Sequence, residues 1–406
     1  MTTAIDTVPA TELAALRDAV GRTEPAFLAD LEQLVNIDCG SYTKAGVDRV
    51  GAWLAERLRA LGASVEVRPH DTFGGTVIGT FEGTPGGPTV LCLAHMDTVF
   101  PEGTVAVRPF RIEDGIARGP GVTDMKSGLL AGVYAIDALR SVLGSVPVGR
   151  LVFVGNPDEE IGSPTSTPHI AALAADADAA LVLECARANG DIVSSRKGMM
   201  SFRVDVHGRA AHAGVEPEKG RSAILEAARI VTGLHALNGR RPDVTVNVGV
   251  IEGGTRPNVV AESCRLEMDA RSVRREDLER LEAEIRAVIA ATVVPDVTVD
   301  VTLEHRWWPM EKLAASARLV DHAVALAGAL GFELRDAATG GASDGNTTAG
   351  LGVPTIDGLG PIGGLDHSPG EYLEVASIVP RTTLLAALIA AIGRDPAFAP
   401  GARRRA

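Results

Sequence analysis

Three short apolar runs, separated by helical stretches, constrain the fold of this chain most. They are VLCLA at 90–94, LVFV at 151–154 and ALVL at 180–183. Runs that are apolar at every position are typical of strands buried on both faces of a sheet. Helical patterns lie between them, at 127–142 and 168–173. The alternation predicts an α/β domain with a mixed, mostly parallel sheet flanked by helices.

A different pattern begins near residue 198. Residues 201–206 alternate apolar and polar side chains, which indicates a half-exposed strand. The stretch that follows reads as helix at 222–237, strands at 244–251 and 264–270, helix at 276–293 and strand at 297–303. This β-α-β-β-α-β order predicts a ferredoxin-like α+β domain.

The α/β pattern resumes after Trp307, with predicted helices at 315–330 and 377–392. A chain of 406 residues exceeds what one compact core usually holds, so we expect two domains. The large domain is predicted from two stretches, 1–197 and 309–406, with the small domain inserted at 198–308.

Charge and apolar patterning exclude several classes of protein. Lys+Arg 39 against Asp+Glu 52 gives a net charge of −13, which a phosphate backbone would repel, so no nucleic-acid partner is expected. No apolar run approaches ~20 residues and the N-terminus lacks a secretory pattern, so no membrane partner is expected. The four cysteines lie far apart, which predicts buried reduced thiols in a cytoplasmic protein.

Side chains of the kind that bind metals recur in five short segments, each after a predicted strand or in a glycine-rich loop. The segments are AHMDTV at 94–99, GPGVTDMK at 119–126, NPDEEI at 156–161, LE at 183–184 and LDHS at 365–368. A parallel sheet brings such loops to one edge. Two histidines and several carboxylates without a thiolate suit Zn²⁺, and also Co²⁺ or Mn²⁺.

The order His-x-Asp, Gly-x-x-Asp-x-Lys, Asp-Glu-Glu, a strand-end Glu and a late His resembles the signature of the M20 family of metallopeptidases. Within that family the likeness is greatest to the glutamate carboxypeptidases of the carboxypeptidase G-like type. The resemblance implies a zinc-exopeptidase fold for the large, catalytic domain and a lid and dimerisation role for the inserted one. It also implies a homodimer whose contact is the helix at 222–237 with its edge strand.

The resemblance implies two zinc ions held by five residues. His95, Asp124 and Glu184 match the ligands of one ion. Asp124, Glu160 and His367 match the ligands of the other, with Asp124 bridging. Each ion then has one imidazole and two carboxylates, which is a ligand set that zinc accepts.

Two further residues match catalytic positions of the family. Asp97 matches a carboxylate that orients His95, because a carboxylate on the far ring nitrogen fixes the tautomer of a ligating imidazole. Glu159 matches the general base, which accepts a proton from the attacking water and passes it to the departing amine. No serine or cysteine nucleophile is needed for this reaction.

Residues of the inserted domain match substrate contacts. His212, in RAAHAG at 209–214, matches a lid histidine that supports the oxyanion, often supplied by the neighbouring subunit. Asn258 and Arg271 match residues that hold the terminal carboxylate of the substrate, and arginine suits this task because its fork meets a carboxylate with two hydrogen bonds. Lid closure is expected to bring His212 and Arg271 to the scissile bond.

Two other positions bear on specificity. Arg306 aligns with a family arginine tied to glutamate side-chain binding, so it favours an acidic C-terminal residue. Gly341 lies in the glycine-rich loop at 339–346, which the resemblance makes a substrate-side loop. This loop reads Ala-Ser-Asp-Gly-Asn where the folate-hydrolysing enzyme has Gly-Gly-Thr-Asp-Ala, which puts a folate substrate in doubt. Asp344 is expected to cap the loop or support a ligand.

Three functions follow from these residues. The first is a carboxypeptidase that releases a C-terminal amino acid, with glutamate favoured. The second is an aminoacylase that uses the same site on an N-acyl amino acid, which motifs cannot separate from the first. The third is a catalytically dead ligand-binding module, which would require the loss of Glu159 or of a metal ligand, and all of these are present.

Overall fold

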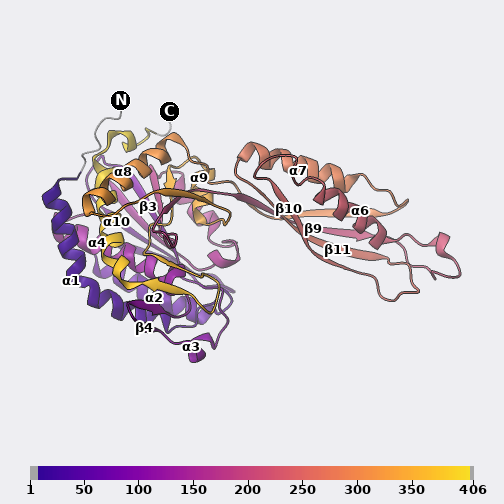
Figure 1. Cartoon of the computed structure of the whole chain (residues 1–406), viewed down its shortest axis with the longest axis horizontal. Helices are drawn as coiled ribbons and strands as arrows, with labels where there is room; N and C mark the ends of the chain where they lie inside the picture. Colours follow the sequence, from indigo (N-terminus) through magenta and orange to yellow (C-terminus); the bar gives the residue numbers. More distant parts are fainter. Residues whose placement is uncertain (1–7, 403–406) are drawn as a thin grey trace. The chain divides into compact units, whose positions relative to one another are not determined.

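The computed structural model describes residues 8–402, which divide into two compact units (Figure 1). The large unit contains the chain up to Ser195, Lys312–Thr339 and the chain from Ser343 onward. The small unit contains Arg196–Glu311 together with Gly340–Ala342. Its main stretch begins two residues before and ends three residues after the predicted limits of 198–308.

The large unit is built on a six-stranded sheet of order β1-β2-β6-β3-β7-β14. Its strands are β1 (Ser64–Arg68), β2 (Thr76–Glu82), β3 (Thr89–His95), β6 (Arg150–Asn156), β7 (Ala179–Val182) and β14 (Thr355–Ile356). The neighbours from β6 to β14 pair in parallel, whereas β1 and β2 pair antiparallel at one edge. The prediction of a mixed, mostly parallel sheet is confirmed.

The centre of this sheet has no polar face, and its strands are apolar at every position for that reason. On β3, Val90, Cys92 and Ala94 belong to one buried cluster, whereas Leu91 and Leu93 belong to another on the opposite face. Helices cover both faces, because neither can be left in water. The first face packs against α1 (Ala10–Val35), α2 (Lys44–Ala60), α4 (Ser127–Leu143), α8 (Ala314–Leu330) and α10 (Ile378–Arg394), and the second against α5 (Thr167–Ala174).

One helical segment of the described chain, Val375–Arg394, is long and apolar enough by length and composition to cross a membrane, with a mean hydropathy of 1.9. Burial inside the large unit accounts for this composition. Its helix α10 packs against α1, α4 and α8, and 78% of the apolar window is buried. The four cysteines are also buried and unpaired, as predicted, while the cytoplasmic compartment stays a prediction.

The small unit is one antiparallel sheet with two helices. Its elements are β9 (Gly198–His207), α6 (Ala223–His235), β10 (Thr245–Gly253), β11 (Ser263–Ser272), α7 (Arg275–Ala290) and β12 (Thr298–Trp307), with sheet order β10-β11-β9-β12. Phe202 and Val204 alternate with half-buried residues along β9 and pack against the helices. The element order is the predicted β-α-β-β-α-β, and the sheet order is that of a ferredoxin-like domain.

Short elements escaped the sequence analysis, because runs of two to seven residues carry little periodic pattern. They include a small sheet of order β15-β16-β5-β4, formed by β4 (Arg111–Glu113), β5 (Ile116–Arg118), β15 (Gly363–Gly364) and β16 (Tyr372–Glu374). The others are α3 (Thr104–Val107), η1 (Val122–Lys126), η2 (Glu159–Ile161), β8 (Ile192–Arg196), η3 (Pro217–Lys219), β13 (Asp336–Thr339), α9 (Asp344–Gly350), η4 (Val375–Ser377) and η5 (Pro396–Phe398).

The glycine-rich stretch at 339–346 is not entirely a loop. Helix α9 begins at Asp344, and Ser343 caps it through a capping box with Asn346. In that arrangement each side chain accepts a hydrogen bond from an otherwise unsatisfied backbone N–H group. The preceding residues, Gly340–Ala342, belong to the small unit.

Candidate metal centre

The carboxyl ends of three neighbouring parallel strands bring three of the five predicted ligands, His95, Glu160 and Glu184, to one edge of the large sheet. Strand β3 ends at His95, which stands opposite Asn156, the last residue of β6. The loops that follow β6 and β7 carry Glu159, Glu160 and Glu184. Ligands collect at this edge of α/β sheets because every loop leaves it in the same direction.

His95 is a buried imidazole with a carboxylate on each side. Its Nε2 atom lies 3.0 Å from Oδ1 of Asp124 and 3.4 Å from Oε1 of Glu184. Its Nδ1 atom lies 3.0 Å from the main-chain oxygen of Asp97 and 3.4 Å from that residue's Oδ1. Asp97 therefore stands on the far nitrogen, where it fixes the ring and directs Nε2 toward the other two residues.

Asp124 connects two such groups, because each of its carboxylate oxygens faces a different imidazole. Oδ1 faces His95, and Oδ2 lies 3.2 Å from Nε2 of His367. The same His367 atom lies 3.1 Å from Oε2 of Glu160. The five predicted ligands thus come together as two groups of one imidazole and two carboxylates, which share Asp124.

The spacing fits a divalent cation in each group. Two ligand atoms bound at about 2.1 Å to one tetrahedral zinc ion lie about 3.4 Å apart. The imidazole-to-carboxylate separations in the two groups run from 3.0 to 3.4 Å. Glu159 is in the same cluster, with a carboxylate oxygen within 4.8 Å of ligand atoms of His95 and Glu184.

Electrostatics also indicate that the cluster needs positive charge. Burial, together with the charges of Glu184, Asp344 and Glu160, raises the pKa of Glu159 well above its usual range, against the opposing effect of His95. Burial likewise raises the pKa of Glu160, although the hydrogen bond from His367 opposes it. Several carboxylates that are buried close together stay ionised only when cations lie beside them, because burial and mutual repulsion both favour the protonated form.

The pKa values of the two imidazoles also indicate that the cluster favours positive charge. Hydrogen bonds to Asp124 and Glu160 raise the pKa of His367 to about 10. Burial lowers the pKa of His95, but Glu184, Asp124 and Asp97 outweigh it and leave the pKa well above its usual range. A proton held between an imidazole and two carboxylates stands where a metal cation would lie.

Asp97 also holds the segment that carries the two adjacent glutamates. Its carboxylate accepts hydrogen bonds from the backbone N–H of Glu159 at 3.1 Å and of Glu160 at 3.2 Å. It accepts a third from the hydroxyl of Ser41 at 2.7 Å. One buried carboxylate therefore positions His95, Glu159 and Glu160 at once, and Ser41 is a supporting residue that the sequence analysis missed.

Glu371 is a second missed residue, and it supports Asp124. Its buried carboxylate accepts hydrogen bonds from the backbone N–H groups of Gly121, Thr123 and Asp124, at 2.9, 2.9 and 3.1 Å. It lies four residues after His367, so its place near the late histidine was the available signal. The carboxylate fixes the irregular turn that presents Asp124.

Asp344 is buried in the first turn of α9 and supports the loop after β6. It accepts hydrogen bonds from Ser163 Oγ at 2.6 Å and from Asn156 Nδ2 at 2.5 Å. Burial raises the pKa of Asp344 to about 6, although both hydrogen bonds oppose the shift. The helix cap is Ser343 rather than Asp344, and the two residues that donate to Asp344 are not predicted ligands, so its support of a ligand stays a prediction.

The substrate-binding candidates of the small unit form two separate groups. His212 and Asn258 are exposed on adjacent loops, which Ala213 N–H joins by donating to the Asn258 oxygen at 3.0 Å. Arg271 donates to the Gly340 oxygen at 2.9 Å, next to Gly341. Within one chain Asn258 therefore lies beside His212 and not beside Arg271, and the shared role of Asn258 and Arg271 in binding a carboxylate stays a prediction.

Strand register puts these two groups at opposite ends of the small sheet. Arg271 pairs with Met199 at the start of β9, whereas Ser263 pairs with His207 at its end, just before the loop of His212. Eight residues of strand span roughly 25 Å. His212 and Arg271 therefore lie far apart within one small unit, and the expectation that both reach one scissile bond stays a prediction.

Arg306 is engaged within the small unit. Its guanidinium forms an ion pair with Glu282 of α7 and stacks over the ring of Trp308, 4.8 Å from the centroid. A guanidinium that already forms an ion pair binds the side chain of a substrate glutamate less strongly. Its role in recognising an acidic C-terminal residue stays a prediction.

Comparison with known proteins gives the family. The family model described as "Peptidase family M20/M25/M40" matches residues 91–391. Carboxypeptidase G2 from Pseudomonas sp. (strain RS-16) is 31% identical over 95% of this chain and 95% of its own length. Acetylornithine deacetylase from Proteus mirabilis (strain HI4320) is 30% identical over 66% of this chain and 73% of its own.

Solved structures agree with this result. Aminopeptidase PepT from Bacillus cereus ATCC 10987 superposes with a TM-score of 0.72 at 26% identity, over 91% of this chain and 98% of its own. The matched region contains the whole cluster from His95 to His367, and the relatives are hydrolases of peptide or acyl–amino acid bonds by name. The chain is therefore a hydrolytic metalloenzyme and belongs to the M20/M25/M40 family of peptidases.

Proposed function

We propose that this protein is a two-zinc carboxypeptidase, which hydrolyses the amide bond of a C-terminal amino acid. The arrangement of Asp124 carries the proposal, because its two oxygens face two imidazoles, each with a second carboxylate beside it. His95, Asp124 and Glu184 would hold one ion, and Asp124, Glu160 and His367 the other. When bound, the pair of ions supplies Lewis acidity and lowers the pKa of a water molecule.

In this proposal Glu159 moves the proton. It accepts a proton from the attacking water and delivers it to the amine nitrogen as the carbon–nitrogen bond breaks. Hydrogen bonds from the backbone to Asp97 hold the segment of Glu159 in place.

The small unit would bind the substrate on the amino-acid side. Arg271, whose guanidinium pairs with Asp269 and lies beside the backbone of Gly341, would bind the terminal carboxylate. His212 would donate a hydrogen bond to the carbonyl oxygen as negative charge develops there, with Asn258 beside it. Glutamate is the C-terminal residue that the resemblance favours, and Arg306, already paired with Glu282, adds no support for it.

We further propose that the enzyme is a homodimer in which His212 acts on the site of the neighbouring copy. The distance between His212 and Arg271 along the small sheet supports this, since a second copy can supply the missing side chain. Strand β10 is an edge of that sheet, and several apolar side chains are exposed there and on α6. They are Ile224, Leu225, Val250 and Ile251, with 41, 59, 37 and 53% of their surfaces exposed.

Substitution of Glu159 tests the assigned base. Glu159→Gln keeps the size of the side chain but cannot accept the proton, so we expect kcat to fall about 10²- to 10⁴-fold. Metal content by elemental analysis should stay at two ions per chain. Glu113→Gln, at an exposed glutamate of β4, serves as the control. Turnover at the parent rate in Glu159→Gln would show that another residue is the base.

An aminoacylase is the second candidate, and the similarity to an acetylornithine deacetylase favours it. The two functions differ only in the group on the acyl side of the scissile bond. A panel of dipeptides, N-acetyl amino acids and N-aroyl amino acids, each with the same C-terminal residue, separates them. If the metal-loaded protein cleaves none of these compounds while a known M20 carboxypeptidase does, the proposed function is wrong.

A further inference from the structure

Arg381, on α10, is a buried charged residue with no part in the chemistry assigned above. Only 1% of its surface is exposed, and within residues 8–402 no carboxylate forms an ion pair with it. Its guanidinium instead donates to three main-chain oxygens, those of Gly360 and Gly190, each at 3.0 Å, and that of Gly358. Burying a charge without an acidic partner costs stability, and this cost points to a role for Arg381 beyond filling space.

The guanidinium stays charged despite its burial. Burial lowers the pKa of Arg381 to about 10, although Asp191 and Cys185 oppose the shift. The group therefore remains protonated at neutral pH, and each carbonyl oxygen accepts a charge-assisted hydrogen bond. Arginine suits this place because its planar fork presents N–H groups in several fixed directions, whereas the ammonium group of lysine is a compact point charge.

Two of the three carbonyl groups lie in the segment that follows β14. This segment, 357–362, continues beside the end of β7, where the predicted metal ligand Glu184 stands. Gly360 N–H donates to the main-chain oxygen of Glu184 at 2.9 Å, and Ala186 N–H donates to the oxygen of the residue after Gly360 at 3.1 Å. The backbone of Glu184 and of the residues that follow it is therefore fixed by the segment that Arg381 binds.

The third carbonyl group lies in the loop that follows β7 itself. Gly190 closes a turn in this loop, because its N–H donates to the Arg187 oxygen at 2.7 Å. Gly190 and Gly358 both adopt left-handed backbone conformations, with φ of 84° and 69°, which glycine reaches without steric cost. Arg381 thus joins the loop that carries Glu184 to the segment that runs beside that loop.

We propose that Arg381 is a positioning residue for Glu184, and that it raises the affinity for one of the two metal ions. The inference rests on the metal centre of the proposed function and adds a residue to it. The ion concerned is the one assigned to His95, Asp124 and Glu184. Arg381 acts through the backbone, since its hydrogen-bond partners are three glycines and none of them is a predicted ligand.

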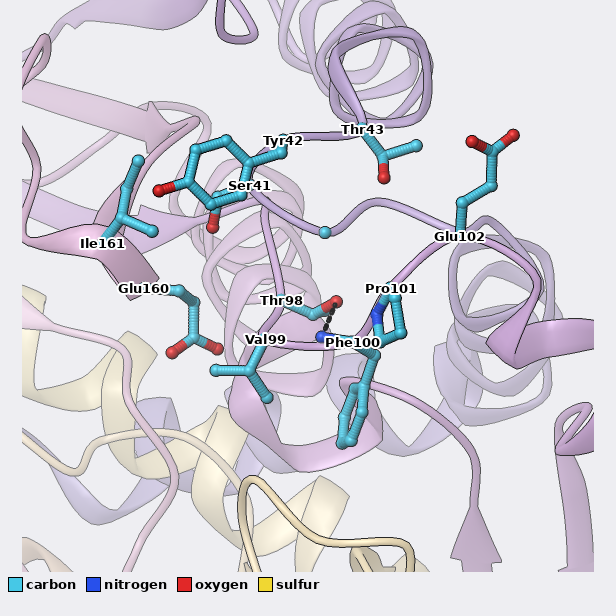
Figure 2. A pocket seen from close by; sticks show the side chains of 11 residues that line it. Ser41, Tyr42, Thr43, Thr98, Val99, Phe100, Pro101, Glu102, Glu160 and Ile161 are labelled. Atoms are coloured by element: carbon cyan, nitrogen blue, oxygen red, sulfur yellow. Dashed lines mark hydrogen bonds between the residues drawn. The ribbon is translucent and has the colours of Figure 1, made fainter. Parts of the chain in front are cut away.

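Other parts of the large unit hold Glu160, a ligand of the second group. Its N–H donates to Asp97, and its side chain lines a pocket of about 350 Å³ (Figure 2). The other residues that line this pocket come from 40–43, 98–102 and Ile161. Neither Arg381 nor the glycines that it binds are among them. Loss of Arg381 should therefore weaken the first ion more than the second.

Zinc affinity, measured by competition with a chromophoric chelator, tests this inference. Arg381→Lys keeps the charge but not the fork, so we expect the affinity for one ion to fall about 10- to 100-fold while the other changes less than about threefold. Arg394→Lys is the matched control, because Arg394 also lies on α10 but pairs with Glu12 and is 35% exposed. Parent-like affinities for both ions in Arg381→Lys would overturn the inference and leave the proposed function standing.

A double-mutant cycle tests whether Arg381 acts through Glu184. Glu184→Ala removes the ligand and should itself weaken the same ion. Adding Arg381→Lys to that variant should change the affinity little, because the group that Arg381 positions is gone. A general structural contribution would instead lower the affinity by the same factor in both backgrounds, and that result contradicts the inference.

A second variant probes the same link without a change at Arg381. A side chain on Gly360 would stand 2.9 Å from the main-chain oxygens of Leu183 and Glu184, so Gly360→Ala should push the segment away and weaken the same ion. Gly328→Ala on α8 is the control, because a side chain there meets nothing within 4 Å. If Arg381→Lys does not fold, this variant decides, and parent-like zinc affinities in Gly360→Ala would refute the link.

Hydrogen exchange of the metal-free protein makes the test independent of zinc. The N–H groups of Gly360 and Ala186 donate across the link, and they should exchange at least about tenfold faster in Arg381→Lys than in the parent. Amides of the central strand β3 should not change. Unchanged exchange at both positions contradicts the inference. If the parent binds no zinc but exchange changes as predicted, the proposed function fails and the effect of Arg381 on the backbone of Glu184 holds.

Discussion

At the scale of single residues, the backbone around Asp124 depends on a carboxylate that is not itself in a ligand position. Glu371 accepts three N–H groups from the turn of Gly121, Thr123 and Asp124. A residue that supports a metal ligand commonly changes metal affinity about 10- to 100-fold when it is replaced. Glu371 is therefore a positioning residue for the bridging aspartate.

We expect Glu371→Gln to weaken zinc binding by roughly that factor, because the amide nitrogen cannot accept an N–H group. Competition with a chromophoric chelator measures the affinity without any need for activity. Glu374→Gln, three residues away on β16, is the control and should bind zinc as the parent does. Equal zinc affinity in Glu371→Gln and the parent would show that Glu371 only stabilises the fold.

The sequence motifs identified the predicted metal ligands but not the residues that hold them in position. His95, Asp124, Glu160, Glu184 and His367 stand in recognisable motifs, and the structure brings all five together. Ser41 and Glu371 stand in no motif, since their role is to bond backbone or carboxylate groups that are distant along the chain. Such contacts depend on tertiary structure and leave no local pattern.

At the scale of elements, the approach of α4 to β7 sets the place of Glu184. A side chain on Gly128, in the first turn of α4, would stand 1.8 Å from the Leu183 oxygen. Leu183 is the residue before Glu184, so only glycine lets the helix lie this close to the ligand. By contrast, a side chain on Gly21 of α1 would meet nothing within 4 Å.

Gly128→Ala should lower the free energy of unfolding by about 1–3 kcal/mol or more, because the added methyl group forces helix and strand apart. It should also lower zinc affinity through Glu184. Gly21→Ala is the matched control, and we expect it to raise stability by about 0.5–1 kcal/mol, since alanine favours the helix. Denaturant unfolding measures both, and a Gly128→Ala protein as stable as the parent would contradict the close approach.

A second contact between elements links α8 to the end of α10. The buried carboxylate of Asp395 accepts hydrogen bonds from Arg318 and, at 2.7 Å, from His322, both on α8. Burial raises the pKa of Asp395, but these hydrogen bonds and one from Ala397 N–H outweigh it and lower the pKa to about 2. The folded state therefore binds this proton less readily than the unfolded state.

A carboxyl group whose pKa is lower in the folded state than in the unfolded state stabilises the fold at pH values above its unfolded pKa. This stabilisation is lost as the pH falls through the folded pKa. Asp395→Asn should cost about 2 kcal/mol of unfolding free energy at pH 7. The difference between parent and variant should shrink as pH falls from about 4 toward about 2. Denaturant unfolding at several pH values between 3 and 7 measures it. A difference that is constant over this range would exclude the ion pair as its source.

Element types were predicted well wherever the pattern was long. The amphipathic helix α7 and the alternating strand β9 could be read from periodicity, because each packs one face on a core and leaves the other in water. Helix α9 was read as loop, since its seven residues include glycine and threonine, and its start depends on the cap at Ser343. Ends of elements were also imprecise, because tertiary contacts decide them.

At the scale of the whole molecule, the proposed role of His212 depends on a second copy of the chain, because His212 and Arg271 lie at opposite ends of the small sheet. Ile251→Glu places a charge on the exposed edge strand β10 and should convert the proposed dimer to a monomer, as measured by light scattering. Zinc content should stay at two ions per chain, while kcat falls because His212 no longer reaches a neighbouring site. Leu351→Glu is the control, since Leu351 is 51% exposed against 53% for Ile251.

A parent protein that is monomeric and fully active would contradict this account of His212. A dimeric Ile251→Glu protein would place the contact elsewhere on the small unit. No sequence pattern could have shown the separation, because the register of β9 with β11 fixes it. The motifs named both residues as candidates but said nothing of their distance within one chain.

The most direct test of the central claim is anomalous diffraction from crystals of the zinc-loaded protein at the zinc absorption edge. We predict two peaks per chain, one among His95, Asp124 and Glu184 and one among Asp124, Glu160 and His367. A single peak, or peaks that do not share Asp124, would contradict the two-metal centre.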